Sequence, residues 1–430
     1  MTIVRAVGLD FGTTNSAIGV VEGDSVRLAK FPHAQGTTET FRSLLYFHPD
    51  ARDASGKQEA IGGPRAIDKY LESEGRGRLV QSMKSYLADR GFQATNIFGR
   101  TQSLVDLLAA LLLDLRMRAE EDLGPLGSKI VCGRPVKFAH ADKPEDEIFA
   151  LDRLRQALGK AGWTDVTFEH EPVGAAYYYE RQLEEDKLVL IADFGGGTSD
   201  FTLIDVGPSR KKRANPASAI LGSDGVGLAG DALDAKMLHN VVAPRLGLGS
   251  TYKAMFGREL EVPVWIYARL RRWHHLSFLK TKKNTELLEE IASQSADRSK
   301  IEALIHILDN DLGYHLYRAI ERTKVELSSK EETKFHFEDS PLLIESTIRR
   351  ADFEGWISEE TNAMAAAVDR LLASTGIPAD SVDQVFMTGG TSFVPAVRKI
   401  FDDRFGHAKI HAGGEMISVA TGLALMASER

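Results

Sequence analysis

The 430-residue sequence lacks several features that would mark whole classes of protein. It has one cysteine, Cys132, so it cannot form an internal disulfide, and we expect a reducing compartment such as the cytoplasm. It has no run of about eighteen apolar residues, so we expect no membrane-spanning helix. Residues 1–12 lack the apolar core of a signal peptide and instead indicate a first strand. The net charge of −8 argues against a general nucleic-acid-binding role.

What is present is typical of a globular protein, with 43% hydrophobic and 27% charged residues. The length favours two or more domains. Apolar periodicity predicts helices over residues 101–120 and 145–162 and one long amphipathic helix over residues 297–330. Strands alternate with these helices, which predicts a two-lobed α/β protein.

A strand–turn–strand unit occurs twice in the chain. An apolar run over residues 3–9 ends in the turn Asp10-Phe11-Gly12-Thr13-Thr14, and a second strand follows. Residues 188–192 end in a similar turn, Asp193-Phe194-Gly195-Gly196-Gly197-Thr198, again followed by a strand-like run. A third glycine turn, at residues 387–392, follows a strand at residues 384–386. The repeat predicts two related halves.

The first turn has the composition of a phosphate-binding loop. A tight turn rich in glycine and threonine directs backbone N–H groups and hydroxyls to one point, which suits a phosphate. Asp10, at the end of the strand, is placed to hold a hydrated Mg²⁺. Taken alone, these residues are equally compatible with an ordinary hairpin turn.

The second turn offers the same groups again, which argues against coincidence. Asp193 supplies a carboxylate, the three glycines allow the backbone to approach a phosphate closely, and Asp200 adds another carboxylate. No Gly-Lys-Ser/Thr follows and the turn leads into a strand, so this is not a P-loop. Two such hairpins facing each other would clamp phosphates between two lobes.

These residues carry a resemblance to the DnaK-type heat shock protein 70 family. Residues 7–16 resemble the family's first phosphate motif, residues 191–200 its second, and residues 171–176 the signature that joins its lobes. Residues 321–328 resemble its adenosine-contacting helix, and residues 389–395 its third glycine motif. The five motifs occur in family order. The closest resemblance is to the YegD-like subgroup, in which the nucleotide-binding domain stands without a peptide-binding domain.

The resemblance implies an actin-like ATPase fold, of the α/β class, with two lobes. Each lobe would contain an α/β/α (ribonuclease H-like) inner subdomain and a smaller outer one. Lobe I would span residues 1–187 (inner about 1–36 and 101–187, outer about 37–100), and lobe II residues 188–430 (inner about 188–227 and 342–430, outer about 228–341).

The resemblance also implies the site. ATP or ADP with Mg²⁺ would lie between the lobes, and Asp10 and Asp193 would hold the metal through water. The residues assigned to catalysis are Lys84, Glu171, Asp193, Thr198 and Asp200. The residues assigned to nucleotide binding are Asp10, Gly12, Thr13, Thr14, Asn15, Gly195, Gly196, Gly197, Glu321, Lys324, Ser328, Gly389, Gly390, Thr391 and Phe393.

Some of these assignments have simple alternatives. A lysine at position 84 could stabilise charge on a transferred phosphoryl group, or it could be a solvated surface lysine. Glu321, Lys324 and Ser328 share one helix face, which an exposed ion-pair face would also explain. Pro135 and Arg155 resemble the family's proline switch and arginine relay, although a helix-capping proline and a surface arginine are the alternatives.

The chain also departs from the family pattern. Val325 and Phe393 match two arginines that sandwich adenine in the family, so the cation–π clamp is absent. Asp231 replaces a glutamate, and Met416 replaces an aspartate near the nucleoside. Residues 251–296 match no family segment, and they are compatible with a solvated helix pair or with a partner-binding surface. No segment of the sequence matches the linker and peptide-binding domain of full chaperones.

We therefore expect an ATP-binding, slowly ATP-hydrolysing switch that resembles a chaperone without a peptide-binding domain. Its partner would be a folded protein or co-chaperone, and neither nucleic acid nor membrane. Three alternatives stay open: a nucleotide-binding adaptor without turnover, a small-molecule kinase of the same superfamily, and a filament-forming actin relative.

Overall fold

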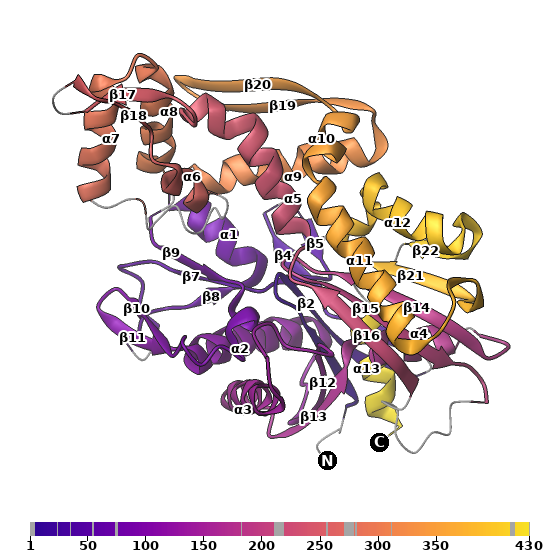
Figure 1. The fold of residues 1–430 in the computed structure, drawn as a ribbon. Coiled ribbons are helices and arrows are strands. Elements are labelled where there is room, and N and C mark those ends of the chain that lie inside the picture. The colour runs from indigo at the N-terminus through magenta and orange to yellow at the C-terminus, as the bar shows by residue number, and fades with distance from the viewer. Residues whose placement is uncertain are drawn as a thin grey trace.

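The computed structural model describes residues 5–429, except 24, 35, 54–55, 74–75, 182, 210–218, 255–256, 271–278, 280–281, 311 and 413–417. Two larger β-sheets form its centre, and helices cover them (Figure 1). Met416 and the basic, aromatic run at 271–278, which the sequence singled out, lie outside the described residues.

The first sheet consists of β1 (Val7–Phe11), β2 (Asn15–Glu22), β3 (Ser25–Leu28), β6 (Phe41–Arg42), β12 (Lys129–Arg134) and β13 (Asp165–His170). Its order is β13-β12-β1-β2-β3, and the short β6 lies beside β2. The strands β1, β2 and β3 form an antiparallel meander, whereas β12 and β13 run parallel to β1 on its other side.

The second sheet consists of β14 (Lys187–Phe194), β15 (Ser199–Val206), β16 (Ile220–Val226), β21 (Gln384–Thr388) and β22 (Ile410–Ala412). Here β14, β15 and β16 form the antiparallel meander, and β21 and β22 run parallel to β14. The order, read as β22-β21-β14-β15-β16, matches the first sheet strand for strand. The repeat predicted from the two turns is therefore confirmed as a repeat of topology.

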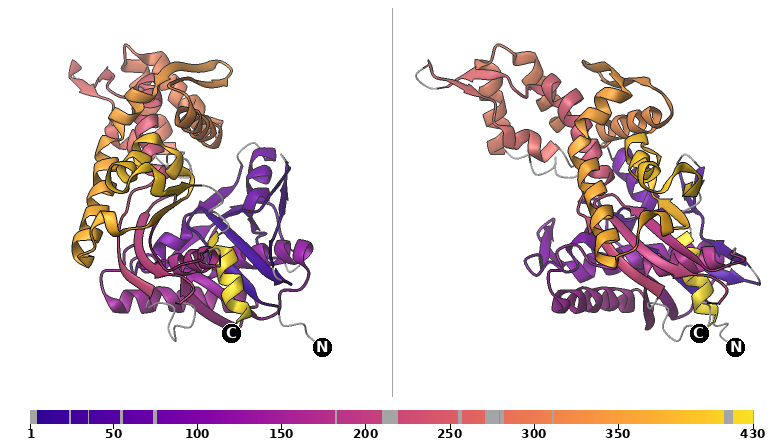
Figure 2. Two further views of the ribbon diagram at one scale, coloured as in Figure 1. Left: turned by 90° about the vertical axis from the view of Figure 1, so that its right-hand side faces the viewer. Right: turned by 45° about the vertical axis from the view of Figure 1, so that its right-hand side comes forward.

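Six helices sandwich the two sheets: α2 (Leu104–Leu123), α3 (Pro144–Lys160), α4 (Glu171–Glu180), α11 (Ser358–Thr375), α12 (Pro395–Phe405) and α13 (Ser418–Ser428). Because side chains alternate along a strand, Leu9 is buried against α2 and α3 while Gly8 lies against α13. Likewise Leu190 packs with α11 and α12, and Ile191 packs with α4 and α13. The helices α4 and α13 therefore lie between the sheets (Figure 2).

The two predicted helices of the first half are confirmed. Ser103 caps α2 by accepting a hydrogen bond from the Asp106 N–H at 3.1 Å. After the end of α3, Gly162 adopts a φ of +94°, which the sequence anticipated by placing a glycine there.

The outer part of the first half contains α1 (Gly63–Glu72), β4 (Phe31–His33), β5 (Gly36–Thr38), β7 (Leu44–Phe47), β8 (Ile61–Gly62), β9 (Arg78–Gln81), β10 (Ala94–Ile97) and β11 (Arg100–Ser103). A single-turn helix, η1 (Met83–Tyr86), follows β9 and carries Lys84. Met83 and Lys84 are both buried, so this part of η1 packs into the protein interior.

The outer part of the second half contains α5 (Gly230–Met237), η3 (Leu238–Val242), η4 (Ala243–Leu246), β17 (Thr251–Lys253), β18 (Glu259–Glu261), α6 (Val264–Leu270), α7 (Lys282–Gln294), α8 (Arg298–Asp309), α9 (Gly313–Ser329), β19 (Glu332–Asp339), β20 (Leu342–Arg349) and α10 (Arg350–Trp356). The strands β17 and β18 with α6, α7 and α8 stand away from the central sheets (Figures 1 and 2). Three further short helices are η7 (Ala379–Ser381), η8 (Gly390–Phe393) and η9 (His407–Lys409).

The expectation of one helix over residues 297–330 was wrong, because the chain forms α8 and α9 with a break between them. Asn310 ends α8, and its side chain donates a hydrogen bond to the His306 carbonyl at 2.9 Å. Asparagine competes with helical backbone bonding in this way, and Gly313 disfavours helix continuation. The apolar periodicity continues across the break, which explains why the pattern suggested a single helix.

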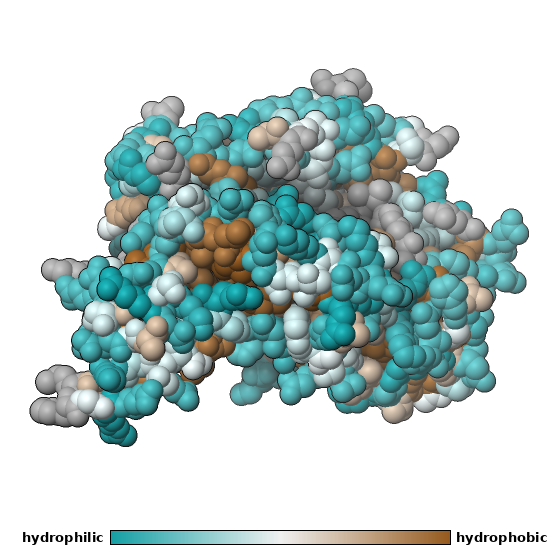
Figure 3. All heavy atoms as spheres, turned by 90° about the horizontal axis from the view of Figure 1, so that it is seen from above, coloured by the Kyte–Doolittle hydropathy of each residue, from teal (hydrophilic) through white to brown (hydrophobic). Residues whose placement is uncertain are grey.

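The face of the molecule that Figure 3 shows is mainly polar. Viewed from the side on which α7, α8 and the β19–β20 hairpin lie, hydrophilic residues dominate and apolar residues form smaller patches (Figure 3). None of the described helices combines the length and the apolarity needed to cross a bilayer.

Candidate functional site

A cleft of about 1290 Å³ opens between the two halves. It is lined by residues of β1, η1, α4, β14, α5, α9, β19 and β21. The predicted site residues line it, with three exceptions that lie outside its walls: Gly197, Ser328 and Phe393. The structure thus brings to one place residues that are more than 300 positions apart in the chain.

The two glycine hairpins face each other across this cleft. At Gly12 a Cβ would lie 2.1 Å from the Asn15 carbonyl oxygen, so the first turn requires glycine. The second turn is closed by the Gly195 N–H, which donates to the Thr198 carbonyl at 2.9 Å. A Cβ at Gly196 would lie 2.2 Å from Thr14 Oγ1, which shows how closely the hairpins approach.

Lys84 and Glu171 form a buried ion pair at the base of the cleft, with Lys84 Nζ 2.7 Å from Glu171 Oε1. Their side chains are 8% and 12% exposed. Burial lowers the pKa of Lys84, but the charges of Glu171 and Asp10 outweigh it, so this pKa lies above its ordinary value. Burial, and then the charge of Glu171, raises the pKa of Asp10 well above its ordinary range. The alternative of a solvated surface lysine does not fit this geometry.

The second hairpin adds two more carboxylates. The Thr388 hydroxyl donates to Asp193 Oδ1, because β21 lies parallel to β14 with Thr388 opposite Asp193. The Thr198 hydroxyl donates to Asp200 Oδ2 at 2.9 Å. Burial, and then the charge of Asp193, raises the pKa of Asp200 to about 7. Asp10, Glu171, Asp193 and Asp200 form an acidic centre around the Lys84 ammonium. Because this centre has more negative than positive groups, a cation that enters it would be stabilised.

The third glycine turn closes the second sheet against the cleft. Gly389 has a φ of +84°, and a Cβ there would lie 2.0 Å from the Phe194 carbonyl oxygen. Only glycine allows the end of β21 to approach β14 this closely. Gly390 and Thr391 follow at the start of η8 and line the cleft.

Helix α9 forms the outer wall of the cleft. Lys324 Nζ lies 2.7 Å from Asp234 Oδ1 in a buried pair. Glu321 Oε1 lies 3.8 Å from Arg42 Nη2, an ion pair that joins the two halves. The Ser328 hydroxyl instead donates to the Lys324 carbonyl at 3.2 Å, within its own helix.

Val325 and Phe393, which match the two adenine-stacking arginines of the resembled family, differ in their position relative to the cleft. Val325 lines the cleft and is 67% exposed, whereas Phe393 is 53% exposed and lies outside the lining. Pro135 also lines the cleft. Arg155 does not line it, because its guanidinium lies over the Phe168 ring and donates to the Val166 carbonyl at 3.0 Å.

Sequence reasoning missed Asp234, Thr388 and Arg42. Thr388 belongs to the third glycine turn but was not assigned to the site, and the parallel pairing of β21 with β14 would have revealed its position opposite Asp193. Asp234 and Arg42 carry no local signal, because only the fold places them beside Lys324 and Glu321.

Among the described residues, no group of three or more His, Cys, Asp or Glu side chains is arranged to hold a metal ion by itself. The acidic centre can still attract a hydrated divalent cation, since Mg²⁺ keeps several waters and usually binds to one or two carboxylates together with phosphate oxygens.

Two comparisons with known proteins agree with this architecture. A family model described as Hsp70 protein matches residues 285–428, from α7 to α13. The expectation that residues 251–296 match no family segment was therefore wrong for residues 285–296. The chain is also similar to the chaperone protein DnaK of Thermosipho africanus (strain TCF52B), with 23% identity over 430 residues. That match covers 98% of this chain and 58% of the relative, so the chain spans little more than half of that protein's length.

The family match and the repeated sheets confirm the actin-like ATPase fold that the sequence predicted. The chain is thus similar to the Hsp70 family model over its C-terminal third and to a DnaK chaperone over nearly its whole length.

Proposed function

We propose that the cleft binds ATP and ADP with Mg²⁺ and hydrolyses ATP slowly, so that the protein acts as a nucleotide-dependent switch. The observation that carries this proposal is the close approach of the two glycine hairpins, with a Gly196 Cβ position only 2.2 Å from Thr14 Oγ1. Hairpins this close can bind one polyphosphate from both sides, since glycine turns expose backbone N–H groups.

The charges around the hairpins suit a magnesium nucleotide. Asp10 and Asp193 would hold the ion through water, and Glu171 would order its waters. The ion would offset the negative charge that the carboxylates and phosphates bring together. The raised pKa of Asp10 supports this, because it reflects a buried carboxylate with too little positive charge nearby.

Hydrolysis would follow in-line attack by water. The water oxygen forms a bond to the γ-phosphorus, and the bond from that phosphorus to the β–γ bridging oxygen breaks, with its electron pair leaving on ADP. Asp200, which accepts a hydrogen bond from Thr198, would orient the water and accept its proton. Lys84 would stabilise the charge on the transferred phosphoryl group.

The nucleoside would lie along α9, where Glu321, Lys324 and Thr391 line the cleft. Because Val325 offers no guanidinium to stack on the base, we propose weaker discrimination between ATP and GTP than an arginine clamp would give. The state of the nucleotide would be communicated to a folded protein or co-chaperone. The similarity to a chaperone supports this kind of partner.

The proposal is tested by measuring release of inorganic phosphate from ATP with Mg²⁺. We expect slow phosphate release that stops when Mg²⁺ is chelated. Tight ATP binding without phosphate release would favour the adaptor that has lost turnover. Phosphate transfer to an added sugar, detected by mass spectrometry, would favour the small-molecule kinase.

A further inference from the structure

The turn that carries Lys84 is fixed on both sides. Before it, Ser82 has φ 57° and ψ 27°, a left-handed conformation that residues other than glycine rarely adopt. Such a conformation persists only where the surrounding structure holds it. After it, the Leu87 N–H donates to the Lys84 carbonyl at 3.1 Å, and both Leu87 and Ala88 are buried. The position of the Lys84 ammonium therefore depends on what holds residues 82–88.

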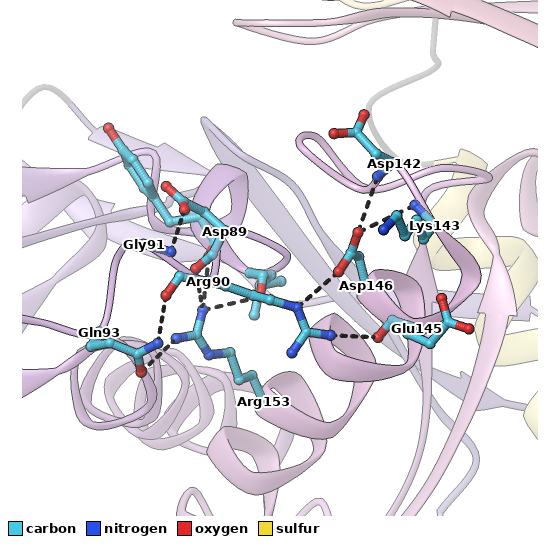
Figure 4. Close-up of polar contacts among 11 residues, drawn as sticks. Asp89, Arg90, Gly91, Gln93, Asp142, Lys143, Glu145, Asp146 and Arg153 are labelled. Carbon is cyan, nitrogen blue, oxygen red and sulfur yellow. Dashed lines mark hydrogen bonds and ion pairs between the residues drawn. The ribbon is translucent and has the colours of Figure 1, made fainter.

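Arg153, on α3, contacts the segment that follows η1 through five hydrogen bonds. Figure 4 shows its guanidinium directed from α3 into the loop that follows η1. It donates hydrogen bonds to the carbonyl oxygens of Tyr86 (3.1 Å), Leu87 (3.2 Å), Asp89 (3.0 Å) and Phe92 (2.9 Å) and to Gln93 Oε1 (3.3 Å). One side chain thus bonds four backbone oxygens and one side-chain oxygen within the segment 86–93.

This arginine is itself rigidly held. It is 6% exposed, and its guanidinium lies 4.2 Å from the centroid of the Phe149 ring. Burying a guanidinium is costly unless its N–H groups are bonded, and here the loop carbonyls bond them. The loop depends on Arg153 in turn, because without this side chain several carbonyl oxygens of the loop would lose a hydrogen-bond donor.

Arg90, in the same loop, provides a natural comparison. Its Nε lies 2.9 Å from Asp146 Oδ1 and its Nη2 donates to the Glu145 carbonyl at 3.2 Å (Figure 4). The Arg90 side chain is 56% exposed and that of Asp146 is 16% exposed, and ion pairs with a solvated cation contribute little to stability. Both arginines therefore join the loop to α3, but only Arg153 does so from a buried position.

We propose that Arg153 is a positioning residue for Lys84: it fixes residues 86–93 and so holds η1 with the Lys84 ammonium beside Glu171. Without Arg153, the loop carbonyls would turn toward water, and Lys84 would spend less time at the site. The effect on rate rests on the proposed ATP hydrolysis, whereas the effect on the turn does not. Displacing a catalytic group by about 1 Å can lower a rate by roughly 100-fold.

The first test measures the turn without nucleotide. Hydrogen exchange is compared in wild type, Arg153→Met, Arg153→Lys and Arg90→Met. In Arg153→Met, we expect the amides of Ser85, Leu87 and Asp89 to exchange at least about tenfold faster, while the amides of α2 keep wild-type rates. The exchange rates in Arg153→Lys should lie between those of wild type and Arg153→Met, because a lysine ammonium has three donors but lacks the planar fork of a guanidinium. Arg90→Met should match wild type.

The second test measures single-turnover hydrolysis of ATP with Mg²⁺ and the Kd for ADP. We expect Arg153→Met to lower the rate by about 10- to 100-fold and to leave the Kd within about threefold. Arg153→Lys should restore part of the rate. Adding Arg153→Met to Lys84→Ala should cause no further loss, because both act through one ammonium.

Unchanged exchange at residues 85–89 in Arg153→Met, or an equal loss of rate and of ADP affinity, would overturn the positioning role. If Arg153→Met does not fold, Arg153→Lys decides the question by the same two readouts. Absence of hydrolysis in the wild type would remove the proposed reaction alone, and the exchange comparison would still decide what Arg153 does.

Discussion

Gly196 and Thr14 belong to different halves of the protein, yet a Cβ at Gly196 would lie 2.2 Å from Thr14 Oγ1. We predict that Gly196→Ala displaces the Thr14 hydroxyl and separates the hairpins, which weakens ADP binding by about tenfold or more. The measurement is a calorimetric titration in the presence of Mg²⁺.

The neighbouring glycine is the matched control. No atom lies within 4 Å of a Cβ at Gly197, so Gly197→Ala adds the same methyl group without a clash. Its Kd should stay within about threefold of wild type. If both substitutions weaken binding equally, the spacing between the hairpins is not what the site depends on.

The second prediction concerns turnover. Lys84→Ala and Asp193→Asn should each lower single-turnover ATP hydrolysis by about two to three orders of magnitude, because Lys84 would stabilise the transferred phosphoryl group and Asp193 would hold the Mg²⁺ beside it. ADP binding should survive in Lys84→Ala, since this contact forms mainly in the transition state. Lys69→Ala, at an exposed pair with Glu72 on α1, is the control. A Lys84→Ala rate within threefold of wild type would refute the assigned role.

The third prediction concerns stability and pH. Burial raises the pKa of Asp200 to about 7, above its value in the unfolded chain. Below about pH 4 the group is protonated in both states. Between about pH 4 and pH 7 only the unfolded state loses its proton, so the free energy of unfolding falls as pH rises.

Asp200→Asn should remove this decrease in the free energy of unfolding with rising pH, because asparagine cannot ionise. Relative to wild type, the variant should gain about 2–4 kcal/mol of stability between pH 4 and pH 8. Urea unfolding without nucleotide or Mg²⁺ measures the difference at both pH values. A stability difference that does not change with pH would show that Asp200 ionises in the folded protein as it does in the unfolded chain.

The fourth prediction concerns the helices between the sheets. A Cβ at Gly422 on α13 would lie 1.7 Å from the Gly174 carbonyl oxygen on α4. Gly422→Ala must therefore push the helices apart, and we expect a loss of at least about 2–3 kcal/mol. Gly159→Ala, in α3 with no atom within 4 Å of its Cβ, should instead stabilise the protein by about 0.5–1 kcal/mol. Chemical unfolding of both variants measures the contrast, and equal stabilities would contradict it.

The sheets and hairpins could be predicted because their signals are local. An apolar strand ending in an aspartate and glycines identifies β1 and β14, and the similarity of the two turns predicts the repeated topology. The split between α8 and α9 was missed because apolar periodicity does not register a single capping residue such as Asn310. The lobe boundaries remain a proposal.

The site was harder to predict because its contacts join distant parts of the chain. Lys84 and Glu171 are 87 positions apart, and no spacing rule brings them together. Arg153 was missed although it lies on the buried face of α3, three positions after Ala150 and one before Leu154. A charged residue among the buried apolar positions of α3 was the sequence signal that could have identified Arg153. The resemblance pointed instead to Arg155, whose guanidinium packs on Phe168 away from the cleft.

The central claim is that the cleft binds a magnesium nucleotide between its two glycine hairpins. The most direct measurement is a calorimetric titration of ADP into the wild-type protein, with Mg²⁺ and with a chelator. We predict one binding site per chain, with affinity that falls when Mg²⁺ is removed. Absence of binding by either ADP or ATP at millimolar concentration would contradict the account.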